Sequence, residues 1–379
     1  MNNQLIALIR CDASTRVGYG HLMRCMALAD TMRATARWTV IFAIAEDDAA
    51  AERVRAAGFT VEQLYASSSL PTYASVNAVD HLNQINHVNS INQATEGEWL
   101  QQMAERHQAS VLVLDVRSSL SRADVSKLRH EGTLIVSIDD ISERRLEADL
   151  AFYPPIPQVD AMDWSEFSGQ LYHGWDWIMM PAKFAAQKVQ QQNTDMKHAL
   201  PRLLVTMGGS DPAGLTFPVI EALEALPQAF DTRIVTGSAF AHQAQLNERL
   251  KTTQRHYTLI SNPTDMPAVM ADTDLAIASF GATAYELACL GIPAVHLCLS
   301  ADHATSASSL HQAGAALVLG EYKNVSVEQI RAAIENLLIH PEQLIDMRER
   351  SHDLIDGCGL DRILHTIETV LEADYALSI

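Results

Sequence analysis

A histidine stands in a glycine-containing loop near the start of the chain, in the segment 10–24 with the sequence RCDASTRVGYGHLMR. A strand pattern ends just before this segment and a helical pattern begins near His21, so the unpaired N–H groups of the helix start would favour an anion. Arg10, Arg16 and Arg24 add positive charge. The same field disfavours an imidazolium ion, so we expect a neutral His21 that can accept a proton. The segment would equally make a glycine-rich turn with a helix-capping histidine.

A dinucleotide-binding fingerprint is the obvious alternative for this loop. Gly18 and Gly20 supply a G-x-G pattern, but Met23 occupies the position of the third glycine. About seven residues also separate the end of the strand from Gly18, whereas the fingerprint needs its first glycine in the turn directly after the strand. We therefore expect no nicotinamide cofactor.

A second glycine loop follows an apolar run in the other half of the chain, in the segment 205–212 with the sequence VTMGGSDP. Gly208 and Gly209 before a helical pattern form a plausible phosphate cradle. Pro212 excludes a G-x-S-x-G nucleophile turn, and the segment lacks the ending of a Walker A loop. A plain turn remains the alternative.

The segment 279–293, with the sequence SFGATAYELACLGIP, is the most informative. It predicts a strand, a glycine turn and a short helix whose first amides, at Gly281–Thr283, would stabilise a phosphate. Glu286 lies one turn further along the same helix face, where a carboxylate can chelate the two hydroxyls of a ribose. A surface glutamate is the other interpretation.

These loops must be positioned by strands and helices, and short apolar runs alternate with helical patterns through both halves of the chain. The predicted strands are Leu5–Ile9, Trp38–Ala45, Val111–Asp115, Leu134–Ile138, Arg202–Thr206, Thr232–Thr236, Tyr257–Ile260, Leu275–Ser279 and Ala294–Leu299. The predicted helices of the first half are His21–Thr35, Asp47–Ala57, Glu98–His107 and Arg122–His130. Such alternation predicts an α/β protein with two parallel sheets. We expect a domain over 1–185, a domain over 200–379, and an irregular insertion at about 67–93.

Composition limits the classes of function. The chain has 379 residues and a formal net charge of −19, which disfavours a nucleic-acid or anionic-membrane surface. Its five cysteines form no CxxC pair, so we expect reduced thiols in a cytoplasmic protein. No uncharged apolar stretch is long enough to span a bilayer, and MNNQLIALIR is expected to be a first strand and not a signal peptide. No group of His, Asp or Cys residues has metal-ligand spacing, so we expect no metal and no cofactor.

With the three glycine segments in this order, the sequence resembles the PseG/SpsG family, whose best-known members hydrolyse a UDP-diacetamido-trideoxy sugar during pseudaminic acid synthesis. The segments 265–275 and 356–362 also look similar to the family. The resemblance implies the GT-B architecture of MurG-like glycosyltransferases, with two Rossmann-like domains facing a cleft. It implies that His21 activates water at the anomeric carbon and that the C-terminal half grips UDP, with Glu286 on the ribose.

The expected substrate-binding residues follow from these segments and this resemblance. They are Asp12, Gly18, Gly20, Arg24, Gly208, Gly209, Ser210, Asp211, Gly281, Ala282, Thr283, Glu286, Asp302 and His303. Two positions depart from the family: Asp115-Val116-Arg117 stands in place of Asp-His-Tyr, and Asp302-His303 in place of Asn-Gln. Both positions would face the sugar or the diphosphate, so the identity of the sugar stays open.

We therefore expect hydrolysis of a UDP-activated amino-deoxy sugar with inversion at C1, in nonulosonic acid or surface-polysaccharide synthesis. Two alternatives remain. One is an inverting GT-B glycosyltransferase that uses a nucleotide-sugar donor, and the other is a non-catalytic nucleotide-sugar-binding protein. The expected partner is the UDP-sugar itself, and the sequence does not indicate an oligomeric state.

Overall fold

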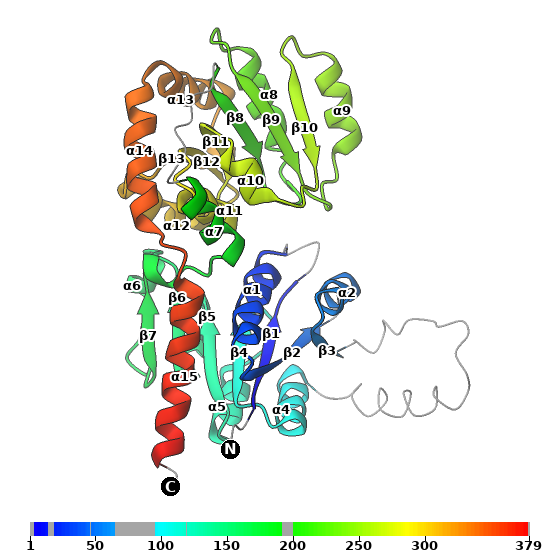
Figure 1. Ribbon diagram of the computed structural model, residues 1–379, viewed down its shortest axis with the longest axis vertical. Helices are drawn as coiled ribbons and strands as arrows, with labels where there is room; N and C mark the ends of the chain where they lie inside the picture. The colour runs from blue at the N-terminus through cyan, green and yellow to red at the C-terminus, as the bar shows by residue number, and fades with distance from the viewer. Residues whose placement is uncertain are drawn as a thin grey trace, which may run out of the picture. The chain divides into compact units, whose positions relative to one another are not determined.

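Two parallel α/β units make up the protein in the computed structural model (Figure 1). The structure describes residues 4–13, 19–45, 47–64, 95–118, 120–191 and 200–377. Gly18 and the predicted insertion at 67–93 lie outside these residues.

Unit 1 contains a seven-stranded sheet in the order β3-β2-β1-β4-β5-β6-β7. The pairs from β3 through β6 are parallel. The strands are β1 (Leu5–Cys11), β2 (Trp38–Ala45), β3 (Thr60–Leu64), β4 (Val111–Asp115), β5 (Leu134–Ile138), β6 (Leu150–Tyr153) and β7 (Gln170–His173). The α-helices of this unit are α1 (Gly20–Ala34), α2 (Asp48–Ala56), α4 (Glu96–His107) and α5 (Arg122–His130), whereas α6 (Gln158–Ala161) belongs to unit 2 although it lies between β6 and β7 in the sequence. All residues of β4 and β5 are buried, which explains why these central strands read as continuous apolar runs.

Unit 2 contains a six-stranded parallel sheet in the order β10-β9-β8-β11-β12-β13. The strands are β8 (Arg202–Thr206), β9 (Asp231–Thr236), β10 (Tyr257–Ser261), β11 (Leu275–Ser279), β12 (Ala294–Cys298) and β13 (Ala316–Glu321). The α-helices are α7 (Ala182–Gln191), α8 (Thr216–Glu224), α9 (Gln243–Lys251), α10 (Met266–Ala271), α11 (Ala282–Cys289), α12 (Ala301–Gln312), α13 (Val327–Ile339) and α14 (Pro341–Leu354). Apolar side chains of the sheet enter two separate buried clusters, so helices cover both of its faces. The predicted α/β class and the predicted strands are confirmed.

We expected two continuous domains, over 1–185 and 200–379, but the chain crosses between the two units several times. Unit 1 comprises residues 1–153, 162–172 and 361–379, and unit 2 comprises 154–161 and 173–360. The last helix, α15 (Gly359–Leu377), therefore belongs mainly to unit 1. Glu368 on α15 accepts a hydrogen bond from Trp38 Nε1 at 3.0 Å, which attaches the helix to β2.

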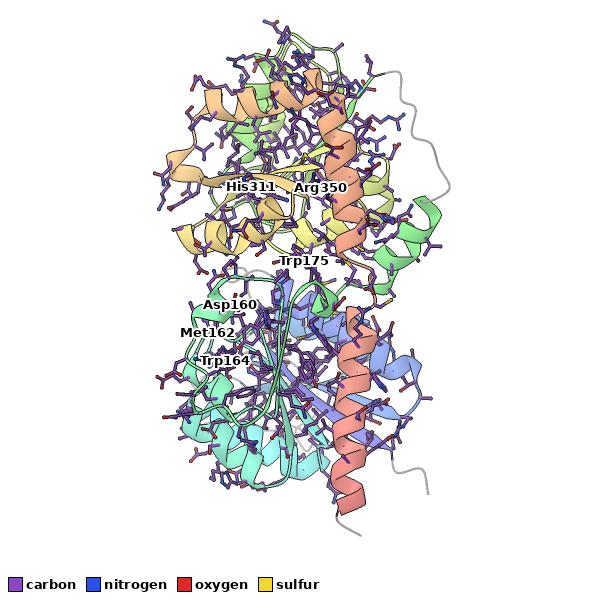
Figure 2. The ribbon with its side chains drawn as sticks, turned by 90° about the vertical axis from the view of Figure 1, so that its left-hand side faces the viewer. Asp160, Met162, Trp164, Trp175, His311 and Arg350 are labelled. Carbon is purple, nitrogen blue, oxygen red and sulfur yellow. The ribbon has the colours of Figure 1, made fainter. Side chains whose placement is uncertain are left out.

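Side-chain contacts explain the other transfers. Trp164, labelled in Figure 2, packs edge-on against Tyr153 and Phe167, and Arg145 lies over its ring, so the segment 162–172 returns to unit 1. The buried Lys188 on α7 donates to the carbonyls of His352 and Ile355 at 2.5 and 2.6 Å. These bonds hold α7 in unit 2, although the sequence pattern places it at the end of the first half.

Candidate functional site

The order of strands in unit 1 places a ligand crevice at a defined point. From β1 the chain proceeds to β2 and β3 on one side, and from β4 it proceeds to β5 and β6 on the other. Loops after β1 and β4 therefore diverge, and open α/β sheets bind ligands at such a switch point, outside the carboxyl ends of the strands. Asp12 follows β1 directly, and Asp115 is the last residue of β4.

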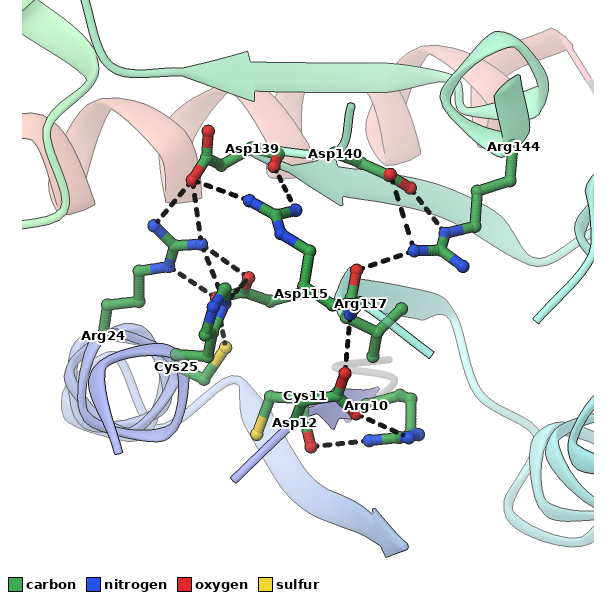
Figure 3. Close-up of polar contacts among 12 residues, drawn as sticks. Arg10, Cys11, Asp12, Arg24, Cys25, Asp115, Arg117, Asp139, Asp140 and Arg144 are labelled. Carbon is green, nitrogen blue, oxygen red and sulfur yellow. Dashed lines mark hydrogen bonds and ion pairs between the residues drawn. The ribbon is translucent and has the colours of Figure 1, made fainter. Parts of the chain in front are cut away.

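His21 lies at this switch point, in the first turn of α1, and contacts the carboxylate of Asp115, which is labelled in Figure 3. Its Nδ1 is 2.6 Å from Oδ1 of Asp115, whose side chain is fully buried. A carboxylate oxygen at this distance pairs with a proton on Nδ1, and in the neutral ring Nε2 is then the proton acceptor. No side chain caps the start of α1. The histidine therefore serves the Asp115 carboxylate and not the helix terminus, which excludes the helix-capping alternative.

Arg24, one turn along α1, binds the same carboxylate through two nitrogens. Its Nε lies 2.6 Å from Asp115 Oδ2 and its Nη2 lies 2.6 Å from Asp115 Oδ1. Burial alone would raise the pKa of Asp115, but the charge of Arg24 and the hydrogen bonds from Arg24 and His21 outweigh burial and hold that pKa well below its usual range. Asp115 is therefore ionised at neutral pH. The structure thus engages Arg24, a predicted substrate ligand, with protein carboxylates.

Asp12 and Arg117 join the loops that follow β1 and β4. Asp12 accepts a hydrogen bond from the Arg117 backbone N–H at 2.6 Å and pairs with the buried Arg10 at 2.8 Å. Arg144, also buried, binds Asp140 at 2.6 Å and donates to the carbonyls of Val116, Ser118 and Leu120. The backbone on both sides of Arg117 is therefore fixed. Asp12, predicted to bind substrate, has both oxygens on protein donors.

Asp139 connects Arg24 and Arg117 in this cluster. Its Oδ2 lies 3.3 Å from nitrogens of both Arg24 and Arg117, and its backbone oxygen accepts from Arg117 Nη1 at 2.5 Å. The residue has a φ of 51°, a left-handed conformation that a non-glycine residue adopts only under constraint. Such conformations gather at functional sites, and this one directs the carboxylate toward the arginines.

Unit 2 has its own switch point, between β8 and β11. The predicted phosphate loops follow these two strands. A Cβ atom added to Gly208 would lie 3.7 Å from the Ser279 hydroxyl, so the two loops are in contact. Gly208 has a φ of 75°, which favours glycine. A Cβ on Gly237 would lie 2.5 Å from the Gly209 carbonyl oxygen, so the loop after β9 also requires glycine to approach this turn.

The start of α11 carries the other predicted UDP ligands. Gly281 precedes the helix without a side-chain cap, and Ala282 and Thr283 form its first turn. Burial raises the pKa of the half-buried Glu286 to about 7, although Lys183 and the Thr283 hydroxyl oppose this shift. The carboxyl group is therefore close to its titration point near neutral pH, and a ligand that donates hydrogen bonds would favour its ionised form.

Asp211, predicted to bind substrate, is buried and occupied within its own loop. Its carboxylate accepts from the backbone N–H groups of Leu215 and Thr216, at 2.8 and 3.0 Å, and from the Thr216 hydroxyl at 2.7 Å. These bonds satisfy the first amides of α8 and fix the loop that contains Gly208, Gly209 and the half-buried Ser210. Asp211 thus shapes the loop from inside.

Asp302 and His303 lie in the first turn of α12. Asp302 Oδ1 accepts from Gln158 Nε2 at 2.9 Å, and the same nitrogen donates to the Ser306 hydroxyl. The His303 ring lies 6.1 Å from Phe280, and its buried Nδ1 has no hydrogen-bond partner among the described residues. His303 therefore lies beside the loop at the end of β11, whereas Asp302 is directed toward Gln158.

Three of the side chains that build the site in unit 1 were not among the site residues expected from the sequence. Asp115 and Arg117 were noticed as departures from a family pattern, and Asp139 was not singled out. A signal existed in each case, because Asp115 ends one apolar strand and Asp139 directly follows another. A carboxylate at the carboxyl end of a buried parallel strand is a candidate ligand or partner for a site.

Comparisons with known proteins show a similarity to glycosyltransferase sequences over part of the chain. Residues 203–357 match the glycosyltransferase family 28 C-terminal domain. The chain is 27% identical over 207 residues to the spore coat polysaccharide biosynthesis protein SpsG of Bacillus subtilis strain 168, covering 54% of this chain and 60% of SpsG. The match thus spans less than two thirds of that relative.

Solved structures show the same fold over nearly the whole chain. The crystal structure of Acinetobacter baumannii MurG matches with a TM-score of 0.68 and 12% identity, covering 97% of this chain and 99% of MurG. Anabaena Alr3699/HepE in complex with UDP matches with a TM-score of 0.59 and 13% identity, covering 96% and 100%. At these identities the likeness shows the fold, which is that of the GT-B glycosyltransferases.

The described residues include neither a candidate metal cluster nor a candidate membrane-spanning helix. Within the ranges that the structure describes, no three His, Cys, Asp or Glu residues are grouped so that they could hold a metal ion. No helix in those ranges is long and apolar enough to cross a membrane.

Proposed function

We propose that this protein is an enzyme that transfers a sugar from a nucleotide-sugar donor to a hydroxyl group, with inversion at C1. The observation that carries the proposal is the His21–Asp115 pair at the switch point of unit 1, because Nδ1 is engaged and Nε2 is available as a base. A positioned base contributes roughly 10²–10⁴ to the rate of such a reaction. The match to family 28 and the fold shared with a UDP complex support a nucleotide-sugar donor.

In the proposed step, Nε2 of His21 takes the proton of the incoming hydroxyl while its oxygen forms a bond to C1. The bond between C1 and the phosphate oxygen breaks, and its electron pair leaves with the nucleotide. Asp115 stabilises the imidazolium ion that forms. Backbone amides at Gly208–Gly209 and at the start of α11 stabilise the charge of the leaving diphosphate.

UDP is the proposed nucleotide, bound by unit 2. Glu286 chelates the ribose hydroxyls from α11, and the first turn of that helix faces the phosphates. Charge on the carboxylate strengthens its hydrogen bonds to hydroxyl donors. Lys183 and Thr283 already favour the ionised form of Glu286. Hydrogen bonds from the ligand therefore need to supply only the rest of the stabilisation that offsets burial.

Hydrolysis of a UDP-activated amino-deoxy sugar is the second candidate. It is favoured by the resemblance of segment 18–24 to the PseG/SpsG family and by the similarity to SpsG. The same base and the same leaving group serve both reactions. The two differ only in the nucleophile, which is water in one and an acceptor hydroxyl in the other.

A panel of UDP- and CMP-sugars, each with and without candidate acceptors, separates these functions. Nucleotide release that needs an acceptor indicates transfer, and release in its absence, with ¹⁸O from labelled water in the sugar, indicates hydrolysis. Tight binding of UDP, with no release of nucleotide from any donor, would instead indicate a non-catalytic nucleotide-sugar-binding protein. His21→Asn tests the base, with His107→Asn as its control, because His107 pairs with Glu62 in the same unit.

A further inference from the structure

The guanidinium group of Arg24 makes almost all of its contacts with carboxylates of the protein. Nε and Nη2 bind the two oxygens of Asp115 at 2.6 Å, and Nη1 and Nη2 each lie 3.3 Å from Asp139 Oδ2. The Arg24 side chain is 22% exposed. A substrate phosphate would have to displace two carboxylates that already hold this cation.

The position of Arg24 relative to His21 has an electrostatic consequence. Arg24 Nη2 lies 3.1 Å from Nδ1 of His21, and both groups contact the same oxygen of Asp115. An unpaired buried aspartate beside an imidazole would stabilise a second proton on the ring, because the ion pair would remove an isolated charge from the interior. The guanidinium group of Arg24 instead provides the positive charge that balances Asp115, so the imidazole does not need to be charged.

The surroundings of the pair contain other titratable groups, several of them drawn in Figure 3. Cys25 on α1 donates to Asp115 Oδ2 at 3.5 Å. The pKa of Cys25 is raised by burial, next by its contact with Cys11 on β1 and also by the Asp115 charge, so the Cys25 thiol stays uncharged. Asp139 after β5 and Arg117 after β4 pair with each other. Arg24 is therefore the cation in contact with Asp115.

We propose that Arg24 is a positioning residue that acts on His21 through Asp115, neutralising the buried carboxylate so that the imidazole stays uncharged, with its Nε2 lone pair available. The inference rests on the proposed role of His21 as a base. It replaces the expectation that Arg24 binds substrate. The two roles differ in their kinetic result: a lost ligand raises KM at every pH, whereas a lost neutralising charge shifts the acidic limb of the pH profile.

The direct test is an NMR titration of the intact protein labelled at histidine ¹³Cε1, with His21→Asn identifying the signal. In Arg24→Gln the titration midpoint of His21 should rise by about one to three pH units, because the aspartate is left without its cation. Asp115→Asn should lower the midpoint, since Arg24 then faces the imidazole alone. Arg33→Gln is the matched control, because Arg33 lies on the same helix and forms its ion pair with the exposed Asp30.

The proposal would be overturned if Arg24→Gln folds but its His21 titration midpoint stays within about 0.3 pH units of the wild type, or falls. Loss of a charge that neutralises Asp115 must raise this midpoint by more than that. If circular dichroism shows that this variant does not fold, Asp115→Asn and Arg24→Lys decide the question. Arg24→Lys keeps the charge and should titrate as the wild type does, and an unchanged or raised midpoint in Asp115→Asn would refute the coupling.

The titration needs no substrate, so it is independent of the proposed reaction. Once a donor substrate of the enzyme is known, its kcat/KM can be measured against pH. The kcat/KM of Arg24→Gln should approach that of the wild type at higher pH, and a purely structural defect would not produce such a recovery. If the midpoints shift as expected but His21→Asn keeps full turnover, the coupling stands and the assignment of His21 as the base fails.

Discussion

Replacing Glu286 by Gln should stabilise the protein without ligand and weaken its binding of UDP. The side chain keeps its shape but no longer titrates. In the wild type, burial raises the pKa of Glu286 from the ordinary value of 4.5 to about 7. Between these two values the folded state holds a proton that the unfolded state has released, so the stability of the wild type falls as the pH rises through this window.

The size of the effect follows from the same two values. At about 1.4 kcal/mol per pH unit, the shift corresponds to about 3 kcal/mol, an upper value for a half-buried group that water partly screens. We therefore expect Glu286→Gln to be about 1–3 kcal/mol more stable than the wild type at pH 8. Near pH 4 the two proteins should be equally stable, because the carboxyl group is then protonated in both states.

Thermal melting of wild type and Glu286→Gln from pH 4 to pH 8 measures this difference. For a unit of this size, about 1 kcal/mol moves Tm by about 2–4 °C. Glu221→Gln, at an exposed position on α8, is the control for the loss of a carboxylate. A Tm difference that does not change with pH, or a less stable Glu286→Gln protein at pH 8, would refute the reasoning.

The binding half of the prediction uses calorimetry with UDP. Glu286→Gln should lose about 1–3 kcal/mol of UDP affinity, because charge-assisted bonds to the ribose are weakened. UDP should also displace a proton from wild-type Glu286 at pH 6.5, so the measured enthalpy should vary with the ionisation enthalpy of the buffer. Unchanged affinity together with no proton release would remove Glu286 from the ribose site.

Four further outcomes are expected. His21→Asn should lower turnover at least a hundredfold with little change in UDP affinity, as measured by steady-state kinetics and calorimetry. Turnover should persist in excess EDTA; a loss that Mg²⁺ or Mn²⁺ restores would indicate a metal-dependent transferase. Asp302→Asn with His303→Gln should increase activity on the pseudaminic precursor, and equal activities would show that the substitution is neutral. Arg144→Met leaves the buried Asp140 without its cation and should cost about 3–5 kcal/mol in a urea melt, whereas an unchanged midpoint would contradict the buried ion pair.

The central strands of both sheets could be predicted from the sequence because parallel strands are buried on both faces and read as apolar runs. β3, β6, β7 and β13 were missed. β6 and β7 have only four residues each, and most residues of β3, β7 and β13 are not fully buried. The return of α15 to unit 1 could not be predicted either. Its contact from Glu368 to Trp38 joins residues 330 positions apart, which local periodicity does not encode.

The candidate site was predictable only in part, for the same reason. His21 and Glu286 were found because each follows a glycine turn at the start of a helix, which is a local signal. The partner of His21 was missed, because Asp115 is 94 positions away and becomes a neighbour only when β4 pairs with β1. Asp211 was predicted from its loop, but the loop sequence does not show that its oxygens bind amides within that loop.

The buried Asp115 and the half-buried Glu286, at the two switch points, have opposite electrostatic settings, and this contrast indicates different roles. Asp115 has a pKa held well below its usual range because Arg24 and His21 compensate its charge, so no ligand is needed to ionise it. Glu286 has a pKa raised to about 7 by burial, with only Lys183 and Thr283 opposing the shift. A fully compensated carboxylate keeps one state and can hold another side chain in place. A carboxyl group close to its titration point changes state when a hydrogen-bond donor arrives, as a residue that binds a ligand directly must do.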